Sequence, residues 1–198
     1  MNFFHKAFEN PRVFQLSQML NPFTVGVAKG FVRDFILPIA SNRVLDVGCG
    51  VGPYSNLFDA GTYLGIDINP EYVAQAKRYY GDKFKVMDAC SLSLGVEMFD
   101  AAFCVLTCHH LSDDQTARMV EGVFPSVKPG GAFHIIDALL PIAEVAPVKN
   151  LVFRNDRGRH QRTLGEFSSL LSSVAIIDRV DLRSSILHEV SYFRLLPR

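Results

Sequence analysis

Short apolar runs alternate with helical patterns along most of this chain. The runs at 44–47, 63–67, 84–88 and 99–106 are separated by segments whose apolar residues recur at helical spacing. This alternation is typical of βαβ units, in which parallel strands are joined by helices. Further strands are predicted at 132–136, 174–182 and 186–195, and helices at 53–58, 70–80, from 112 or 113 to 127, and 163–172.

The segment from Asn2 to Ile39 precedes the first strand and is mostly helical in pattern. Apolar residues recur at helical spacing in three stretches, which Asn10-Pro11 and Asn21-Pro22 interrupt. Such helices are expected to pack on one face of the sheet.

A glycine-rich loop follows the first strand, in the sequence Val44-Leu45-Asp46-Val47-Gly48-Cys49-Gly50-Val51-Gly52. Three glycines at alternate positions indicate a loop whose backbone passes close to a ligand, because glycine has no Cβ to hold a bound molecule away. A helix expected from Pro53 would add free backbone N–H groups beside it.

The spacing of these glycines differs from that of a dinucleotide-binding loop. A dinucleotide-binding loop needs the motif Gly-x-Gly-x-x-Gly, and Pro53 stands where the last glycine of that motif would be. Asp46, two residues before the first glycine, would repel a phosphate but suit an ammonium group. The pattern Asp-x-Gly-x-Gly-x-Gly resembles the signature loop of the class I S-adenosylmethionine-dependent methyltransferases.

Two more acids stand where later strands end. Asp67 follows the glycines by about twenty residues, the distance at which a βαβ unit places a carboxylate on ribose hydroxyls. Asp88 ends the third predicted strand. Because ligands bind outside the carboxyl ends of parallel strands, Asp46, Asp67 and Asp88 are expected to face one crevice.

The resemblance assigns a role to each of these positions. It implies that Asp46 and the backbone of Gly48, Cys49 and Gly50 hold the methionine part of S-adenosylmethionine, and that Asp67 binds both ribose hydroxyls. It also implies that Ile68 packs on the adenine, that Asp88 accepts from the adenine amino group, and that the N–H of Ala89 meets a ring nitrogen.

The loop after the fourth strand reads Leu106-Thr107-Cys108-His109-His110. In the resembling family this loop passes under the cofactor, so Leu106 and Thr107 are expected to border it. His109 and His110 either orient the loop by hydrogen bonds or act as a general base. Cys104, Cys108 and the two histidines could suggest zinc, but Cys104 lies within a strand pattern and no second ligand pair follows, so no metal is expected.

Lys128-Pro129-Gly130-Gly131 before the fifth strand is another hallmark of the family, and the resemblance extends from Arg43 to Asp137. Asp137 ends that strand, where it would be a catalytic or acceptor-binding acid or cap a turn. If the acceptor needs a base, His109, His110, His160 and Asp137 are the candidates in that order.

Positive charge gathers between Lys149 and Arg162. This segment is either a solvated basic loop or a site for an anionic acceptor, because arginine forks bind carboxylate and phosphate. The candidate acceptor-binding residues are Arg154, Arg157, Arg159 and Arg162.

Composition indicates the number of domains and the kinds of partner that the chain can have. A chain of 198 residues with 48% apolar content suits one domain, 1–198, with a helical segment at 1–40 and a core at 41–198. Zero formal net charge gives no reason to expect nucleic-acid binding. The longest apolar region, 132–148, is interrupted by charges and prolines, so no membrane segment is expected. Four cysteines in mostly apolar surroundings favour a cytoplasmic protein.

The resemblance implies a Rossmann-like three-layer α/β/α sandwich with a seven-stranded, mostly parallel sheet, an antiparallel last strand and an N-terminal helical cap. In the cap interpretation Phe3, Phe4 and Arg12 would face the site. The implied activity is transfer of the methyl group of S-adenosylmethionine to a small-molecule acceptor. A non-catalytic cofactor-binding or scaffold protein and, less strongly, a nicotinamide-dependent oxidoreductase are the alternatives. The sequence leaves the oligomeric state open.

Overall fold

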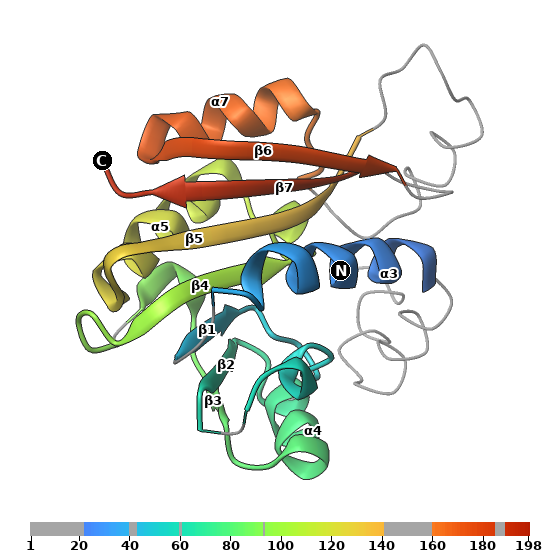
Figure 1. Cartoon of the computed structure of the whole chain (residues 1–198), viewed down its shortest axis with the longest axis vertical. Coiled ribbons are helices and arrows are strands. Elements are labelled where there is room, and N and C mark those ends of the chain that lie inside the picture. The colour runs from blue at the N-terminus through green and yellow to red at the C-terminus, as the bar shows by residue number, and fades with distance from the viewer. Residues whose placement is uncertain (1–21, 40–42, 60, 93, 141–159, 185–188) are drawn as a thin grey trace.

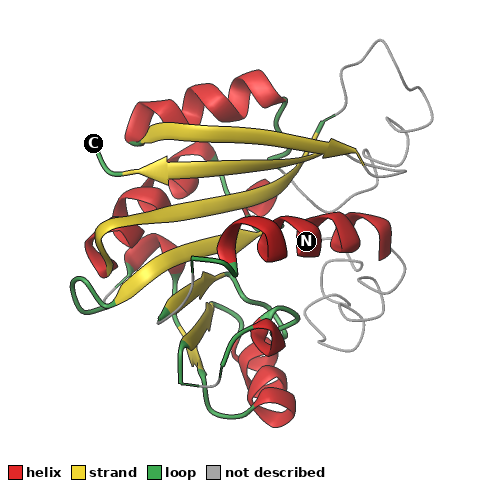
Figure 2. Ribbon diagram, viewed as in Figure 1, coloured by secondary structure: helices red, strands yellow, loops and turns green. Residues whose placement is uncertain are grey.

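The computed structural model describes residues 22–39, 43–59, 61–92, 94–140, 160–184 and 189–198. They form a seven-stranded sheet with helices on both faces (Figures 1 and 2). The strands are β1 (Val44–Val47), β2 (Tyr63–Asp67), β3 (Phe84–Val86), β4 (Phe99–Val105), β5 (Val127–Leu139), β6 (Ile176–Ser184) and β7 (Glu189–Leu196). The α-helices are α3 (Pro22–Phe31), α4 (Pro70–Tyr80), α5 (Asp113–Val123) and α7 (Leu164–Val174).

The strand order is β3-β2-β1-β4-β5-β7-β6. The first five strands in this order are parallel, and β7 runs antiparallel to both β5 and β6. The order reverses between β1 and β4, and ligands of open α/β sheets bind at such a switch point. The predicted fold class, including the antiparallel last strand, is confirmed.

Two apolar layers cover the sheet. On one face α5 and α7 contribute Met119, Val120, Phe167 and Leu171 to the core. On the other face α3 and α4 lie against the sheet, and Phe31 of α3 stacks on Tyr192 of β7 with ring centroids 5.6 Å apart. Each helix therefore buries one stripe against the sheet, as amphipathic helices do.

Helix starts follow their capping residues closely. The Asn69 side chain accepts from the N–H groups of Glu71 and Tyr72 at the start of α4. Ser112 caps α5 and Thr163 caps α7, each in a complete capping box. These side chains satisfy backbone donors that a helix leaves without an internal partner, and so fix where each helix begins.

The helix expected from Pro53 to Phe58 is wrong. Only a 3-10 turn, Ser55–Leu57, forms there, and Phe58 returns to an extended conformation. The Phe58 ring stacks on Tyr63 and Phe103, so burial of this aromatic side chain draws the backbone out of a helical path. The glycine loop therefore has no long helix behind it.

Several element ends also differ from the predictions. The predicted helix to Val127 stops at Val123, and a 3-10 turn at Phe124–Ser126 includes Pro125, which lacks the N–H that an α-helix needs. The fifth strand is longer than predicted. Its pairing with β4 shifts register between Phe99 and Ala101, because Lys128 to Gly131 bulge within the strand.

The N-terminal prediction is tested only in part. Residues 1–21, which include Phe3, Phe4 and Arg12, lie outside the described residues. Within the described part, α3 is followed by a π-helical turn at Val32–Ile36, and both are packed on the sheet. None of the helices in the described residues has the length and apolar character that crossing a membrane requires.

Candidate functional site

The glycine loop leaves β1 and folds back onto the end of β2. The N–H groups of Gly48 and Cys49 both donate to the carbonyl of Ile66 at 2.9 Å. Gly48, Gly50 and Gly52 all have positive φ, at 72°, 54° and 80°. Residues with a Cβ atom adopt positive φ only at a cost in free energy, so the backbone conformation itself favours glycine at these three positions.

Packing within the protein is a second reason for two of these glycines. A Cβ on Gly48 would lie 2.7 Å from the Thr107 side chain, and one on Gly52 would lie 2.8 Å from the ring of Phe84. The sequence had suggested that the missing side chains make room for a ligand. At these two positions the protein's own side chains fill the space.

The Asp67 carboxylate joins the glycine loop to the start of α4. Its Oδ2 accepts from the N–H of Gly50 at 2.8 Å, and its Oδ1 accepts from the N–H of Asn69 at 2.8 Å. Burial raises the pKa of Asp67, and the two backbone hydrogen bonds oppose that shift. Because a carboxylate has about four acceptor positions, Asp67 retains capacity for hydroxyl donors. Ile68 beside it is 66% exposed, an apolar surface next to the acid.

Asp46 lies deeper than the sequence suggested. It is 1% exposed and accepts from the Tyr63 hydroxyl at 2.5 Å. Burial raises the pKa of Asp46 to about 7, although the bond from Tyr63 lowers it. The carboxyl group thus sits beneath the loop, within β1 and one residue before its end.

Tyr63 is a residue that the sequence reading missed. Parallel pairing places Val44 opposite Tyr63, and side chains alternate along a strand, so Asp46 and Tyr63 share one face. The strand register, which the sequence does not state, was the information needed.

Asp88 lies beyond β3 and caps a 3-10 turn, Ala89–Ser91. Its Oδ1 accepts from the N–H of Cys90 at 2.8 Å. The expectation that it ends the third strand is wrong by two residues, since β3 stops at Val86. The roles expected for Asp88 and Ala89 toward an adenine ring stay predictions.

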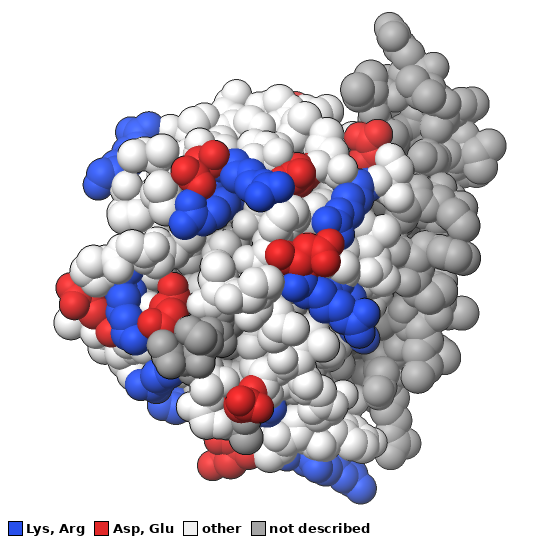
Figure 3. Space-filling model, viewed as in Figure 1, with Lys and Arg blue, Asp and Glu red and all other residues white. Residues whose placement is uncertain are grey.

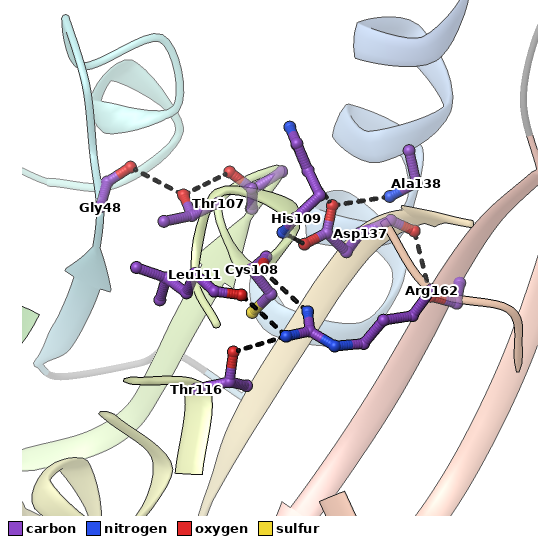
Figure 4. Close-up of polar contacts among 11 residues, drawn as sticks. Gly48, Thr107, Cys108, His109, Leu111, Thr116, Asp137, Ala138 and Arg162 are labelled. Atoms are coloured by element: carbon purple, nitrogen blue, oxygen red, sulfur yellow. Dashed lines mark hydrogen bonds and ion pairs between the residues drawn. The ribbon is translucent and has the colours of Figure 1, made fainter. Parts of the chain in front are cut away.

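The loop after β4 connects the glycine loop to the neighbouring strand end. Leu106 has φ of 52° and donates its N–H to the carbonyl of Ile136 at 2.8 Å. The Thr107 hydroxyl lies 3.3 Å from the carbonyl oxygen of Gly48, to which it donates (Figure 4). Thr107 therefore ties this loop to the glycine loop, and Leu106 ties it to β5, at the point where the strand order reverses. That Leu106 and Thr107 border a cofactor stays a prediction.

His109 and Asp137 form a close pair at the ends of β4 and β5. His109 Nδ1 lies 2.5 Å from Asp137 Oδ1, and its backbone N–H donates to Oδ2 at 3.0 Å. The side chain of His109 is 13% exposed and that of Asp137 is 2% exposed. Figure 4 shows the two side chains directed at each other. This hydrogen-bonded pair consists of two of the four catalytic candidates.

The position of Asp137 differs slightly from the prediction. It does not end β5, which continues to Leu139 along β7. The parallel pairing with β4 does stop at Ile136, so Asp137 is the first residue beyond it. A residue at this point faces the loop that leaves β4.

Arg162, far from this loop in sequence, binds it through its guanidinium group. Its guanidinium group donates to the carbonyls of Cys108 and Leu111 at 3.0 and 2.7 Å, and to Asp113 at 2.8 Å. Arg162 is 7% exposed. Its fork is thus directed into the protein and engages the loop that carries His109, in place of the acceptor contact expected from the sequence.

The other basic and histidine candidates are placed less completely. His160 donates its backbone N–H to the carbonyl of His109 at 3.0 Å. The His110 ring lies against that of His109, with centroids 4.1 Å apart. Arg154, Arg157 and Arg159 lie outside the described residues. Among those described, no group of three or more metal-binding side chain types gathers at one point.

Comparisons with known proteins agree with this geometry. Residues 44–131 match the family model described as a methyltransferase domain. A sterol 24-C-methyltransferase of Clavispora lusitaniae is 34% identical over 110 residues, which are 48% of this chain and 28% of that protein. A tRNA (carboxymethyluridine(34)-5-O)-methyltransferase of Arabidopsis thaliana is also 34% identical, over 102 residues, which are 50% of this chain and 25% of that protein.

Solved structures extend the likeness over the fold. The structure of a mitomycin 7-O-methyltransferase superposes with a TM-score of 0.73 at 17% identity, covering 100% of this chain and 61% of that one. This chain spans only a quarter to two fifths of the length of the first curated relatives that it matches. The names of the first two of these relatives state different acceptors, a sterol and a tRNA.

Proposed function

Because residues 44–131 match the methyltransferase domain model and the fold is shared with S-adenosylmethionine-dependent methyltransferases, we propose that this chain binds S-adenosylmethionine and methylates a small-molecule acceptor. The observation that carries the proposal is the joining of the Gly50 N–H to the Asp67 carboxylate at the switch point of the sheet. A hydrogen bond within the protein thereby fixes the acid and the glycine loop against each other.

The residues at this point fit the cofactor. Asp67 keeps acceptor capacity for the ribose hydroxyls, and exposed Ile68 offers an apolar surface for the adenine. Asp88 and the N–H of Ala89 are proposed for the adenine edge. The loop from Gly48 to Gly50, with Asp46 beneath it, is proposed for the methionine end. When bound, the cofactor supplies a methyl group on a sulfonium, which is already a good leaving group.

The protein's own contribution is then alignment of the acceptor and exclusion of water. A small-molecule acceptor is favoured over nucleic acid by the charge of the chain. Its formal net charge is zero, and acidic and basic side chains are interspersed on the face seen in Figure 3. A nucleic-acid surface gathers positive charge, since phosphate contacts supply most of the affinity.

Two expectations from the sequence stay predictions. The first is that Arg154, Arg157 and Arg159 hold an anionic acceptor. Arg162 is no longer proposed for this role, because its guanidinium group binds atoms of the protein itself. The second is that the whole chain forms one domain, with its first forty residues as a cap.

Equilibrium binding separates this proposal from its alternatives. Calorimetric titration with S-adenosylhomocysteine is expected to show micromolar affinity, while NADH is expected not to bind. Binding of NADH alone would favour an oxidoreductase, and no binding of either ligand would remove the proposal.

Turnover needs a separate measurement. A metabolite extract incubated with the protein and with methyl-labelled cofactor should yield a labelled product. The Asp67→Ala variant serves as the control for label transferred by other proteins in the extract. Cofactor binding without any labelled product would support a non-catalytic binding protein instead.

A further inference from the structure

We propose that His109 and Asp137 act together as the general base of this site, and that the atom methylated is therefore the oxygen of an acceptor hydroxyl group. The inference rests on the proposed function and narrows its substrate class. It is carried by the geometry of the pair and by the contacts that hold the His109 loop.

The hydrogen bonds of Asp137 fix which ring nitrogen of His109 carries a proton. Asp137 accepts from the N–H of His109 at Oδ2 and from the N–H of Ala138 at Oδ1, at 3.0 and 2.8 Å. The short contact from Oδ1 to Nδ1 of His109 then makes Nδ1 a donor. In the neutral ring one nitrogen is a donor and the other an acceptor, so Nε2 is the basic atom.

This arrangement suits a base better than a structural histidine. Asp137 orients the ring and stabilises the imidazolium that forms when Nε2 takes a proton. A histidine that served only to hold the loop would be satisfied by the backbone bond from His109 to Asp137. The additional 2.5 Å bond at Nδ1 acts on the ring alone.

The loop that carries His109 is held from two sides. Thr107 contacts the carbonyl of Gly48, which ties the loop to the proposed cofactor site. Arg162 binds the carbonyls of Cys108 and Leu111, the residues on either side of the two histidines. Arg162 is thus a positioning residue, because it acts on the base through the backbone of the loop.

The chemistry of the acceptor follows from the need for a base. A neutral alcohol or phenol is a weak nucleophile until its proton is removed, whereas an unprotonated amine, such as an aniline at neutral pH, attacks through its lone pair and a carboxylate is already ionised. The acceptor oxygen forms the bond to the methyl carbon as its proton moves to His109 Nε2. S-adenosylmethionine, when bound, would supply the methyl group and keep the electron pair of the carbon–sulfur bond on sulfur, and His109 would later release the proton to water.

The groups facing His109 come from several elements. Asp137 and the N–H of Ala138 belong to β5, and His110 stacks on the ring from the same turn. The backbone N–H of His160 donates to the carbonyl of His109, and Arg162, paired with Asp113 at the start of α5, binds the carbonyls of Cys108 and Leu111 on either side of the two histidines. Asp137 is the carboxylate in direct contact with the ring among the described residues.

The first test is spectroscopic and needs no acceptor. Nitrogen-15 NMR of the imidazole rings of the full chain, with His109 assigned from the His109→Gln variant, should show the form protonated at Nδ1 at neutral to basic pH. In Asp137→Asn the side-chain amide can donate to Nδ1, so the form protonated at Nε2 should replace it. A ring protonated at Nε2 in the unaltered protein would overturn the inference.

The second test measures methyl transfer from labelled cofactor to a panel of phenols and alcohols, with anilines and amines of matched shape. Transfer to hydroxyl compounds is expected. His109→Gln should lower kcat by about 10² to 10⁴-fold. Asp137→Asn should lower kcat and change its pH profile, while Asp114→Asn, an exposed acid on α5 paired with Arg118, is the matched control.

Binding of S-adenosylhomocysteine separates this inference from the proposed function. Each variant should bind it within about twofold of the unaltered chain, because the pair acts on the acceptor. Methylation of amines alone, or of no hydroxyl compound, would overturn the hydroxyl assignment even if the cofactor binds. If the unaltered chain does not bind S-adenosylhomocysteine, the proposed function fails. The NMR result then still decides which ring nitrogen of His109 carries the proton.

Discussion

The two halves of the candidate site are built in different ways. In the cofactor half, at the ends of β1, β2 and β3, the polar contacts of Asp67 join it to the backbone of Gly50 and Asn69, 17 and 2 residues away. In the acceptor half, at the ends of β4 and β5, the polar contacts join more distant residues, such as His109 to Asp137 and Arg162 to Cys108. The first half depends mainly on backbone conformation, and the second on side chains that the whole fold brings together.

This difference predicts where each half is sensitive. A backbone that must adopt positive φ tolerates little change at its glycines, whatever the side chains around it do. A long-range cluster depends on each buried partner, because removing one leaves the others without a hydrogen bond. Four substitutions test that contrast between the two halves of the site.

Gly48→Ala should destabilise the cofactor half most. The new Cβ would meet Thr107 at 2.7 Å, and φ of 72° disfavours alanine. We expect the free energy of unfolding to fall by about 2 to 4 kcal/mol in denaturant titrations. Gly61→Ala is the matched control, since a Cβ there meets nothing within 4 Å, and should change stability by less than about 1 kcal/mol. Equal effects of the two changes would contradict the backbone argument.

Arg162→Met should be the corresponding change in the acceptor half. The carbonyls of Cys108 and Leu111 would lose their charged donor, while the bond to exposed Asp113 counts for little. We expect a loss of about 2 to 3 kcal/mol in the free energy of unfolding. Arg179→Met removes an arginine that is half exposed and should cost less than about 1 kcal/mol. A small loss at Arg162 would show that the loop does not depend on it.

Asp67→Ala should weaken binding of S-adenosylhomocysteine by about 1.5 to 3 kcal/mol, the range for hydrogen bonds to a charged group. It also removes the acceptor of the Gly50 N–H, so the loop loses one of its anchors. Calorimetry on the folded variant measures the effect, with exposed Asp82→Ala as control. Unchanged affinity would take Asp67 out of the site.

Asp46→Asn should change how stability depends on pH. The pKa of Asp46 is raised from 3.8 to about 7, so below about pH 4 the carboxyl is protonated in both folded and unfolded chains. As pH rises from about 4 to 7 the unfolded chain releases its proton first, and the folded state loses up to about 1.4 kcal/mol of stability per pH unit. The variant lacks this loss, and its amide oxygen still accepts from Tyr63.

Denaturant titrations of both proteins over this range give the difference directly. The stability of Asp46→Asn relative to the unaltered chain should rise with pH and level off above about pH 7. His134, whose pKa burial lowers to about 3, gives the opposite trend but is present in both proteins and cancels. A difference that does not vary with pH would show that Asp46 titrates normally.

The same contrast explains what could be read from the sequence. The alternation of strands and helices along the chain, the helices at 70–80 and 163–172 and the placing of Asp67 at the end of β2 follow from local patterns, and the structure agrees with them to within two residues. Aromatic burial at Phe58 cancelled a local helix signal, because packing between distant strands outweighed propensity. The sequence put His109 and Asp137 among the catalytic candidates, but their pairing depends on the alignment of β4 with β5.

Arg162 shows the same limit from the other side. Its position in a basic stretch suggested a contact with an anionic ligand, and charge pattern alone cannot tell a solvent-facing arginine from a buried one. Only the return of residues 160–162 to the loop after β4 shows that its donors are used inside the protein.

The place of β7 between β5 and β6 has a consequence for the order of folding. β6 and β7 pair locally, with Ser184 opposite Glu189, and such a hairpin forms in about 1 to 10 μs. Leu139 of β5 pairs with the same Glu189, so docking the hairpin must close a loop of fifty residues. Until it docks, β5 has an open edge on which a second unfolded chain can pair. Refolding yield should therefore fall as protein concentration rises, and a yield independent of concentration would show that this edge is covered early.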